Sequence, residues 1–127
     1  MAKLVYLDTH AIAWLYANEL EKFSMDTLLL IEENQIVISP MVLLELTYLY
    51  EIGRLQDSGQ TIVDVLQKTI DLKICDLTHL QVIQAALEVT WTRDPFDRII
   101  VAQASVHQST LVTKDKLIHK HYLQSIW

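Results

Sequence analysis

Short apolar runs that lead straight into a helix start are the feature of this sequence that most constrains its fold. "KLVYL" (residues 3–7) is followed at once by "DTHAIAWLYAN", with Asp8 or Thr9 as the helix cap. "QIVIS" leads in the same way into a helix with Ser39 as N-cap and Pro40 at its first position. Strands that alternate with helices form a parallel sheet covered by helices on both faces. We therefore expect an α/β fold.

The remainder of the chain continues this alternation. Gly53 is predicted to end the second helix, which runs to about Ile52. The further elements expected are a polar helix over residues 58–69, a strand in "LKIC", a helix in "DLTHLQVIQAALEV" capped by Asp76 or Thr78, a helix from Pro95, a strand in "STLVT", a short helix in "KDKLIHKHY" and an edge strand in "LQSIW". In such sheets ligands bind beyond the carboxyl ends of the strands, so we expect the chemistry at that edge.

Length and composition predict one compact domain over residues 1–127, because the chain is 51% apolar and has only two glycines and two prolines. The longest apolar runs, such as residues 41–44, are too short to span a membrane, and no signal peptide opens the chain, so a cytoplasmic protein is expected. The single cysteine, Cys75, is predicted to be a small core residue. The net charge of −6 argues against nucleic-acid binding through a broad basic surface, unless several of the acids bind cations.

Two acidic residues lie just beyond the ends of predicted strands. Asp8 comes immediately after the first strand, and Asp115 lies two residues beyond the strand that ends at Thr113. Taken alone, Asp8 is explained as a helix cap and Asp115 as an acid in the first turn of a helix. Thr113 is predicted to cap that last helix, and its hydroxyl is also a candidate to face the site.

Glu45 and Asp97 are harder to explain in this way. At about 100° per residue, Glu45 lies on the apolar side of its helix, and Asp97 shares a stripe with Ile100 and Val101. A carboxylate near a buried face is costly unless a positive group meets it. Asp94, one residue before the helix that starts at Pro95, is interpreted first as the helix cap and second as a metal ligand.

Asp8, Glu45, Asp97 and Asp115 are expected to meet at one edge of the sheet, because a parallel sheet gathers its strand ends there. Carboxylates that converge oppose one another's ionisation unless cations are present, and all-oxygen ligands favour Mg²⁺ or Mn²⁺ over zinc. One or two such ions would form a site for phosphodiester hydrolysis. The candidates for phosphate contacts are the flanking cations Arg93, Arg98, Lys114 and Lys116. Ordinary surface charge explains any one of these cations equally well.

Four segments carry a family resemblance: "VYLDTHAIAW", "ISPMVLLEL", "RDPFDRIIVAQA" and "LVTKD". In this order, and over most of the chain, they resemble the PIN-domain ribonucleases, specifically the VapC-like toxins of bacterial toxin–antitoxin pairs. The resemblance implies a three-layer α/β/α sandwich and Mg²⁺- or Mn²⁺-dependent endoribonuclease activity. It also implies a homodimer that is silenced by a cognate antitoxin protein, which inserts a segment into or beside the active site.

The resemblance also assigns residues. The family's acidic positions fall on Asp8, Glu45, Asp97 and Asp115, and the extra acid of the "DPFD" form falls on Asp94. Polar positions that line the pocket fall on Thr9 and Thr113.

Three other functions remain as alternatives. PIN domains also act in RNA processing outside toxin–antitoxin pairs. A phosphatase or receiver-like domain would take up phosphate on Asp8, but that chemistry commonly uses a second adjacent acid, which "LDTH" lacks. A non-catalytic binding module would use all the acids as caps and surface charges, and this interpretation leaves Glu45 unexplained.

Overall fold

A five-stranded parallel sheet forms the centre of the computed structural model, which describes residues 3–127. The order of the strands across the sheet is β3-β2-β1-β4-β5. The strands are β1 (Leu4–Leu7), β2 (Gln35–Ile38), β3 (Lys73–Ile74), β4 (Thr110–Val112) and β5 (Ser125–Ile126). All neighbouring strands pair in parallel, so their carboxyl ends share one edge of the sheet.

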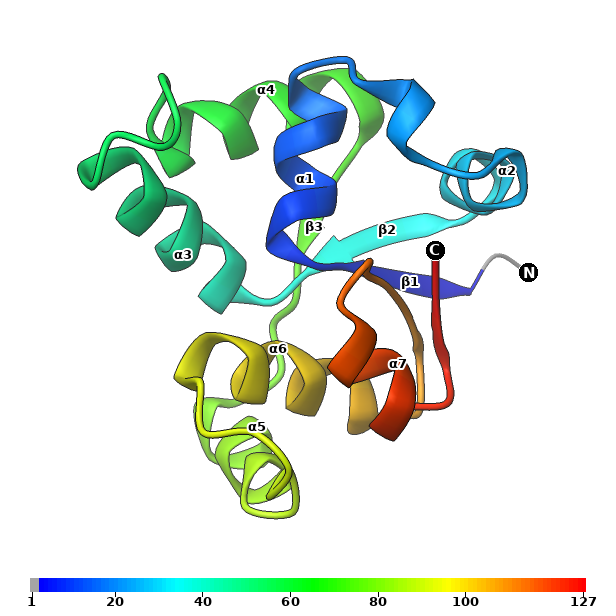
Figure 1. Ribbon diagram of the computed structural model, residues 1–127, viewed down its shortest axis with the longest axis vertical. Coiled ribbons are helices and arrows are strands. Elements are labelled where there is room, and N and C mark those ends of the chain that lie inside the picture. Colours follow the sequence, from blue (N-terminus) through cyan, green and yellow to red (C-terminus); the bar gives the residue numbers. More distant parts are fainter. Residues whose placement is uncertain (1–2) are drawn as a thin grey trace.

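Helices cover both faces of the sheet. They are α1 (Thr9–Tyr16), α2 (Met25–Glu33), α3 (Pro40–Glu51), α4 (Gly59–Ile70), α5 (His79–Ala86), α6 (Pro95–Ser105) and α7 (Lys116–His121), with the 3₁₀ helix η1 (Leu20–Lys22) between α1 and α2. Figure 1 shows α1 and α4 above the sheet and α5, α6 and α7 below it. Helix α3 packs against α4 and also against α6. The predicted α/β/α sandwich is therefore confirmed.

Strand β1 is the central strand, and its residues build the core. It pairs with β2 on one side and with β4 on the other, so that Val5 lies opposite Ile36 and Thr110. Val5 and Leu7 are fully buried, since helices cover both faces of the strand. A strand buried on both sides reads as a continuous apolar run, which is the pattern of "LVYL".

Most of the predicted helix starts are confirmed. Asp8, Ser39 and Thr78 are the N-caps of α1, α3 and α5, and each accepts a hydrogen bond from a backbone N–H of its helix. Gly53 follows the end of α3 with a φ of 81°, a left-handed conformation that glycine adopts without steric cost. The edge strand expected in "LQSIW" is β5.

The structure differs from the sequence-based prediction at three places. Helix α5 ends at Ala86, three residues before the predicted end at Val89. Helix α2, capped by Ser24, was not predicted. Thr113 was predicted to cap the last helix, but the cap of α7 is Asp115. Helix α7 begins at Lys116, so the residue that directly precedes the helix and caps it is Asp115 and not Thr113.

No helix within residues 3–127 combines the length and the apolar character that a membrane crossing requires.

We predict that Gly59→Ala destabilises the fold, because α4 begins in close contact with α3. A methyl group at Gly59 would lie 2.6 Å from Thr47 Oγ1 and 2.7 Å from the Leu43 carbonyl oxygen. Overpacking of this kind costs about 1–3 kcal/mol, measured as the free energy of unfolding in urea. Gln60→Ala, at the exposed next position, is the control and should change it by less than about 0.5 kcal/mol. Equal values for the two variants would contradict the close contact.

Candidate active site

Asp8 lies at the carboxyl end of β1, and hydrogen bonds fix both of its carboxylate oxygens. It is only 3% exposed. Its Oδ1 accepts the backbone N–H of Thr9 at 2.7 Å, which is the capping contact of α1. Its Oδ2 accepts the hydroxyl of Thr113 at 2.7 Å. Asp8 is therefore both a helix cap and part of the group of acids at this edge.

Thr113 connects Asp8 to Asp115. Its buried hydroxyl donates to Asp8 and accepts the backbone N–H of Asp115 at 3.1 Å. Asp115 caps α7 through Oδ1, which accepts the backbone N–H groups of Leu117 and Ile118 at 2.8 and 3.0 Å. Because β1 and β4 are neighbours, the ends of both strands are locked together by side chains as well as by the backbone.

Glu45 reaches the same region from α3. It is half-buried, and its Oε1 accepts a hydrogen bond from the hydroxyl of Thr9. Burial raises the pKa of Glu45, the Thr9 hydrogen bond lowers it, and the charges of Asp8 and Asp94 raise it further. The predicted polar residues Thr9 and Thr113 therefore each hold one of the acids.

Asp97 and Asp94 lie at the start of α6. Asp94 is exposed and caps the helix, since its Oδ1 accepts the N–H groups of Phe96 and Asp97 at 2.9 and 3.1 Å. Asp97 is half-buried, and its pKa is raised from 3.8 to about 7. Burial is the largest cause, followed by the charges of Asp8, Asp94, Asp115 and Glu45. The structure thus brings all five predicted acids into one electrostatic environment.

Positive charge does not compensate these acids. Within residues 3–127, no lysine or arginine forms an ion pair with any of the five. Of the predicted phosphate contacts, Arg93, Lys114 and Lys116 are exposed. Arg98 is half-buried, and its Nε donates to the carbonyl oxygen of Ala86 at 2.9 Å, which holds α6 against α5.

His10 belongs to the site, although the sequence analysis did not select it. Its Nδ1 lies 3.7 Å from Asp8 Oδ2, and its Nε2 accepts the backbone N–H of Lys114 at 2.9 Å. That hydrogen bond requires an unprotonated Nε2, so the ring proton lies on Nδ1 and faces Asp8. Burial lowers the pKa of His10, against the raising effects of Asp8 and Asp115. The available signal was its position in the first turn after β1, two residues beyond Asp8.

The donor chemistry of the five acids fits a hydrated hard cation. Across the described residues, no three acidic, histidine or cysteine side chains already stand as ligands of a single ion. Mg²⁺ commonly keeps several waters and uses only one or two carboxylates, so a preassembled cage is not required. The carboxylates supply the negative charge that such an ion would neutralise, and an ion bound beside Asp97 would oppose the burial and the neighbouring charges that raise its pKa.

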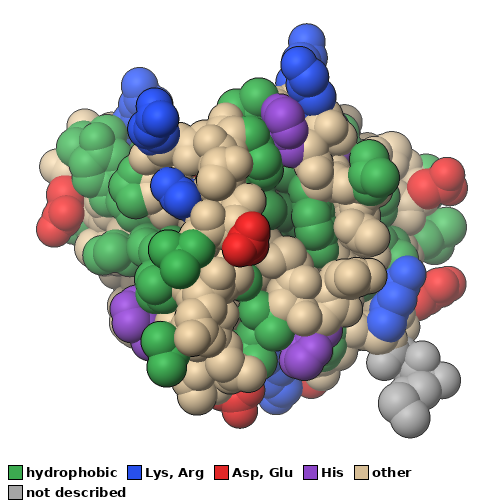
Figure 2. Space-filling view, turned by 90° about the horizontal axis from the view of Figure 1, so that it is seen from below, with side chains coloured by type: hydrophobic (Ala, Val, Ile, Leu, Met, Phe, Trp, Pro, Cys, Tyr) green, Lys and Arg blue, Asp and Glu red, His purple; other side chains and the backbone are tan. Residues whose placement is uncertain are grey.

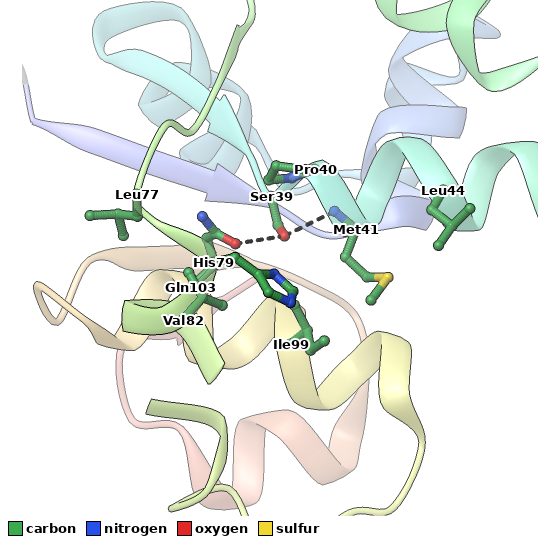
Figure 3. A pocket seen from close by; sticks show the side chains of 9 residues that line it. All are labelled: Ser39, Pro40, Met41, Leu44, Leu77, His79, Val82, Ile99 and Gln103. Atoms are coloured by element: carbon green, nitrogen blue, oxygen red, sulfur yellow. Dashed lines mark hydrogen bonds between the residues drawn. The ribbon is translucent and has the colours of Figure 1, made fainter. Parts of the chain in front are cut away.

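A separate pocket of about 260 Å³ lies between α3, α5 and α6, and none of the five acids lines it (Figure 3). Its wall is mostly apolar, with Met41, Val82 and Ile99 among the lining residues. Gln103 accepts a hydrogen bond from the Ser39 hydroxyl at 2.9 Å, while its Nε2 is buried without a hydrogen-bond partner among the residues described. The Ser39–Gln103 contact ties α6, which carries Asp97, to the start of α3, which carries Glu45.

We predict that Thr113→Val destabilises the protein, because it removes one hydroxyl and leaves Asp8 Oδ2 and the Asp115 N–H without this partner. The expected loss is about 1–3 kcal/mol in the free energy of unfolding. Thr69→Val is a matched control, since the exposed Thr69 hydroxyl donates only to the Val65 carbonyl oxygen of its own helix. A Thr113→Val protein as stable as the control would show that this hydroxyl does not hold the two strand ends together.

We predict that Asp97 makes the fold less stable as the pH rises. Since its pKa is raised to about 7, the folded state binds more protons than the unfolded chain between pH values of about 4 and 7. The free energy of unfolding therefore falls across this interval in chelator. Asp97→Asn should remove that contribution and raise the Tm at alkaline pH by on the order of a few degrees.

The matched control for this experiment is Asp26→Asn, at an exposed position in the first turn of α2. Thermal unfolding is recorded across the pH range for both variants and for the unmodified protein. If Asp97→Asn keeps the pH profile of the unmodified protein, Asp97 does not titrate with a raised pKa.

Comparison with known structures shows relatives of the same fold. One similar chain comes from the crystal structure of VapBC2 from Rickettsia felis bound to a DNA fragment from their promoter. The TM-score is 0.71 at 21% sequence identity, and the match covers 98% of the present protein and 96% of the VapBC2 chain. DNA-bound VapBC from Salmonella typhimurium gives 0.64 at 22% identity, over 96% and 93% of the two chains. A toxin–antitoxin complex from Klebsiella pneumoniae gives 0.63 at 16% identity, over 97% and 96%.

No curated protein matches the sequence. At these identities the solved structures show the fold alone. The family match is more specific, because the PIN domain family matches residues 5–122, which include all five acids. The protein belongs to the PIN domain family.

Proposed function

We propose that the protein is a divalent-metal-dependent endoribonuclease that hydrolyses phosphodiester bonds in RNA. The observation that supports this most directly is the convergence of Asp8, Glu45, Asp94, Asp97 and Asp115 with no lysine or arginine paired to them among the described residues. Membership of the PIN domain family, a family of nucleases, supports the same chemistry.

In this proposal Asp8, Glu45, Asp97 and Asp115 hold Mg²⁺ or Mn²⁺, and Asp94 adds negative charge while it caps α6. Bound ions of this kind polarise a phosphoryl oxygen and lower the pKa of the attacking water. Thr113 and Thr9 orient Asp8 and Glu45 through the hydrogen bonds described above.

RNA phosphates would be held by local cations beside the acids. Figure 2 shows lysine and arginine side chains spread over one face of the molecule rather than gathered into one basic patch. The net charge is −6, since sixteen acidic residues outnumber ten lysines and arginines. Arg93, Lys114 and Lys116 are exposed near the acids in sequence and are the residues proposed for this contact.

We also propose that the nuclease is the toxin of a toxin–antitoxin pair, that it acts in the cytoplasm as a homodimer, and that a cognate antitoxin protein silences it. The support is the shared fold with chains of VapBC complexes and of a toxin–antitoxin complex. Co-expression with the protein encoded by the adjacent gene separates this proposal from an RNA-processing nuclease. A toxin should arrest growth alone and be neutralised by that neighbour.

The residues beside Asp8 do not favour a phosphatase or receiver-like domain. That chemistry commonly uses a second acid adjacent to the first, and the residues that follow Asp8 are Thr9 and His10. The family match to the PIN domain favours the nuclease over this alternative.

We predict that the purified protein cleaves RNA at discrete positions with Mg²⁺ or Mn²⁺ and not with chelator. Asp97→Asn should fold, because the amide still suits the first turn of α6, yet lower the cleavage rate on the order of a hundredfold or more, since several kcal/mol of charge stabilisation are lost. The assay uses defined transfer and ribosomal RNAs and measures initial rates.

Asp94→Asn is the matched control, because asparagine caps a helix nearly as well as aspartate. It should reduce cleavage far less than Asp97→Asn. Divalent ions should raise the Tm of the unmodified protein and leave that of Asp97→Asn nearly unchanged, since only a protein that binds the ion is stabilised by it. Equal cleavage by the Asp97→Asn variant would falsify the assignment.

A further inference from the structure

A cluster of aromatic rings lies at the carboxyl edge of the sheet, on the β5 side of Asp8. Trp127 follows β5 and stacks on Phe23, with ring centroids 4.6 Å apart. Trp14 of α1 lies 5.3 Å from Trp127, and His10 lies 5.2 Å from Trp14 and 5.7 Å from Trp127. The rings come from segments that are far apart in the sequence, and the fold brings them together beside the acids.

Two lysine ammonium groups lie over these rings. Lys114 Nζ is 5.6 Å from the centroid of Trp14 and 5.9 Å from that of Trp127, and Lys22 Nζ is 5.1 Å from Trp14. Both lysines are exposed, while Trp14 and Trp127 are half-buried. The chain has only ten lysines and arginines against sixteen acids, yet all the cation–π contacts recorded within residues 3–127 are in this cluster.

His10 connects the cluster to the acidic site. One of its nitrogens faces Asp8 at 3.7 Å, and the other accepts the backbone N–H of Lys114 at 2.9 Å. Lys114 in turn lies between Thr113, which donates to Asp8, and Asp115, which caps α7. His10 and Lys114 therefore join the cluster to the acids.

We propose that this aromatic-lysine cluster is a subsite that stacks one unpaired nucleobase of the RNA beside the cleaved phosphate. The cluster comprises His10, Trp14, Phe23, Trp127, Lys22 and Lys114. The proposal rests on the proposed nuclease function and adds to it where the substrate lies and what form it takes.

The chemistry of the cluster matches that of single-stranded nucleic-acid sites. Such sites combine aromatic faces, on which bases stack, with cations that contact the backbone. An exposed cation–π contact is weak, so Lys114 can leave the ring for a phosphate when a base takes its place. A base paired inside a duplex has no free face for the ring, so the subsite selects unpaired RNA.

The competing explanation is that the rings only pack the end of the core while the lysines extend along them to solvent. The two explanations differ in what RNA does to the tryptophans. A stacked base changes the fluorescence of Trp14 and Trp127, whereas packing alone gives no response to RNA.

The test is a fluorescence titration in chelator, so that no cleavage occurs. It uses a Trp91→Phe background, because Trp91 stacks on His121 outside the cluster and would add unrelated signal. Single-stranded RNA of about twelve nucleotides, within the range of site sizes for such proteins and long enough to form a stable duplex, is added, and a duplex of the same sequence is added separately. Saturable quenching by the single strand and none by the duplex is expected.

Three substitutions in this background locate the effect. Trp127→Ala should weaken RNA binding roughly tenfold or more, with Trp14 as the remaining reporter. Lys114→Gln retains both fluorophores and should weaken binding several-fold. Lys68→Gln changes the charge equally on the exposed side of α4, away from the cluster, and should bind as the background protein does.

A second readout separates binding from chemistry. With Mg²⁺, Lys22→Gln, whose ammonium group lies over Trp14 and takes no part in the phosphate contacts proposed above, should raise the KM for RNA and leave kcat nearly unchanged. No saturable quenching in the background protein, or equal affinities for Lys114→Gln and Lys68→Gln, would overturn the subsite. Quenching that depends on the cluster, in a protein that cleaves nothing with Mg²⁺ or Mn²⁺, would support the subsite and overturn the nuclease proposal.

Discussion

The parallel pairing of β1 with both β2 and β4 is the constraint on which the rest of the structure depends. It places the ends of three neighbouring strands at one edge, and each strand is followed closely by a helix start. Asp8 leaves β1 where Thr113 leaves β4, so one short hydrogen bond joins residues that are 105 positions apart in the chain. A shift in register of either strand would separate them, so the geometry of the acidic site is set by the backbone of the sheet.

The acidic site illustrates how a fold can accumulate charge of one sign. Three of its five acids cap helices, and each of these three gains hydrogen bonds from backbone N–H groups. Asp97 and Glu45 gain no such capping contact and are half-buried, and these two show the raised pKa values. The helix starts therefore hold three charges in place, while burial first, and then the charges of the other acids, raise the pKa of the two acids that cap no helix.

Much of this structure follows from the sequence, because its strands are short apolar runs and its helices begin at capping residues. Four of the acids were selected because they interrupt apolar faces or follow strands, and Asp94 because it precedes the helix that starts at Pro95. The contact of His10 with the Lys114 backbone spans 104 positions in the chain, and that of Ser39 with Gln103 spans 64. No local sequence pattern predicts either hydrogen bond. Helix α2 was missed because its apolar residues form one short run, residues 28–31, whose periodicity does not distinguish a helix from a strand. Arg98 appeared available for phosphate, but the packing of α6 on α5 engages its Nε.

The double use of the capping acids has a consequence for how relatives of this chain are compared. A relative that had lost catalysis would still need Asp8, Asp94 and Asp115, or an equivalent cap, to begin three of its helices. Those positions therefore persist under selection for folding alone, and their presence in a sequence says little about activity. Glu45 and Asp97 make no capping contact, and burial together with the neighbouring carboxylates disfavours the ionised form of both. Under the proposed nuclease function, only the chemistry keeps these two acids in place, so an inactive lineage would be expected to lose them before the three capping acids.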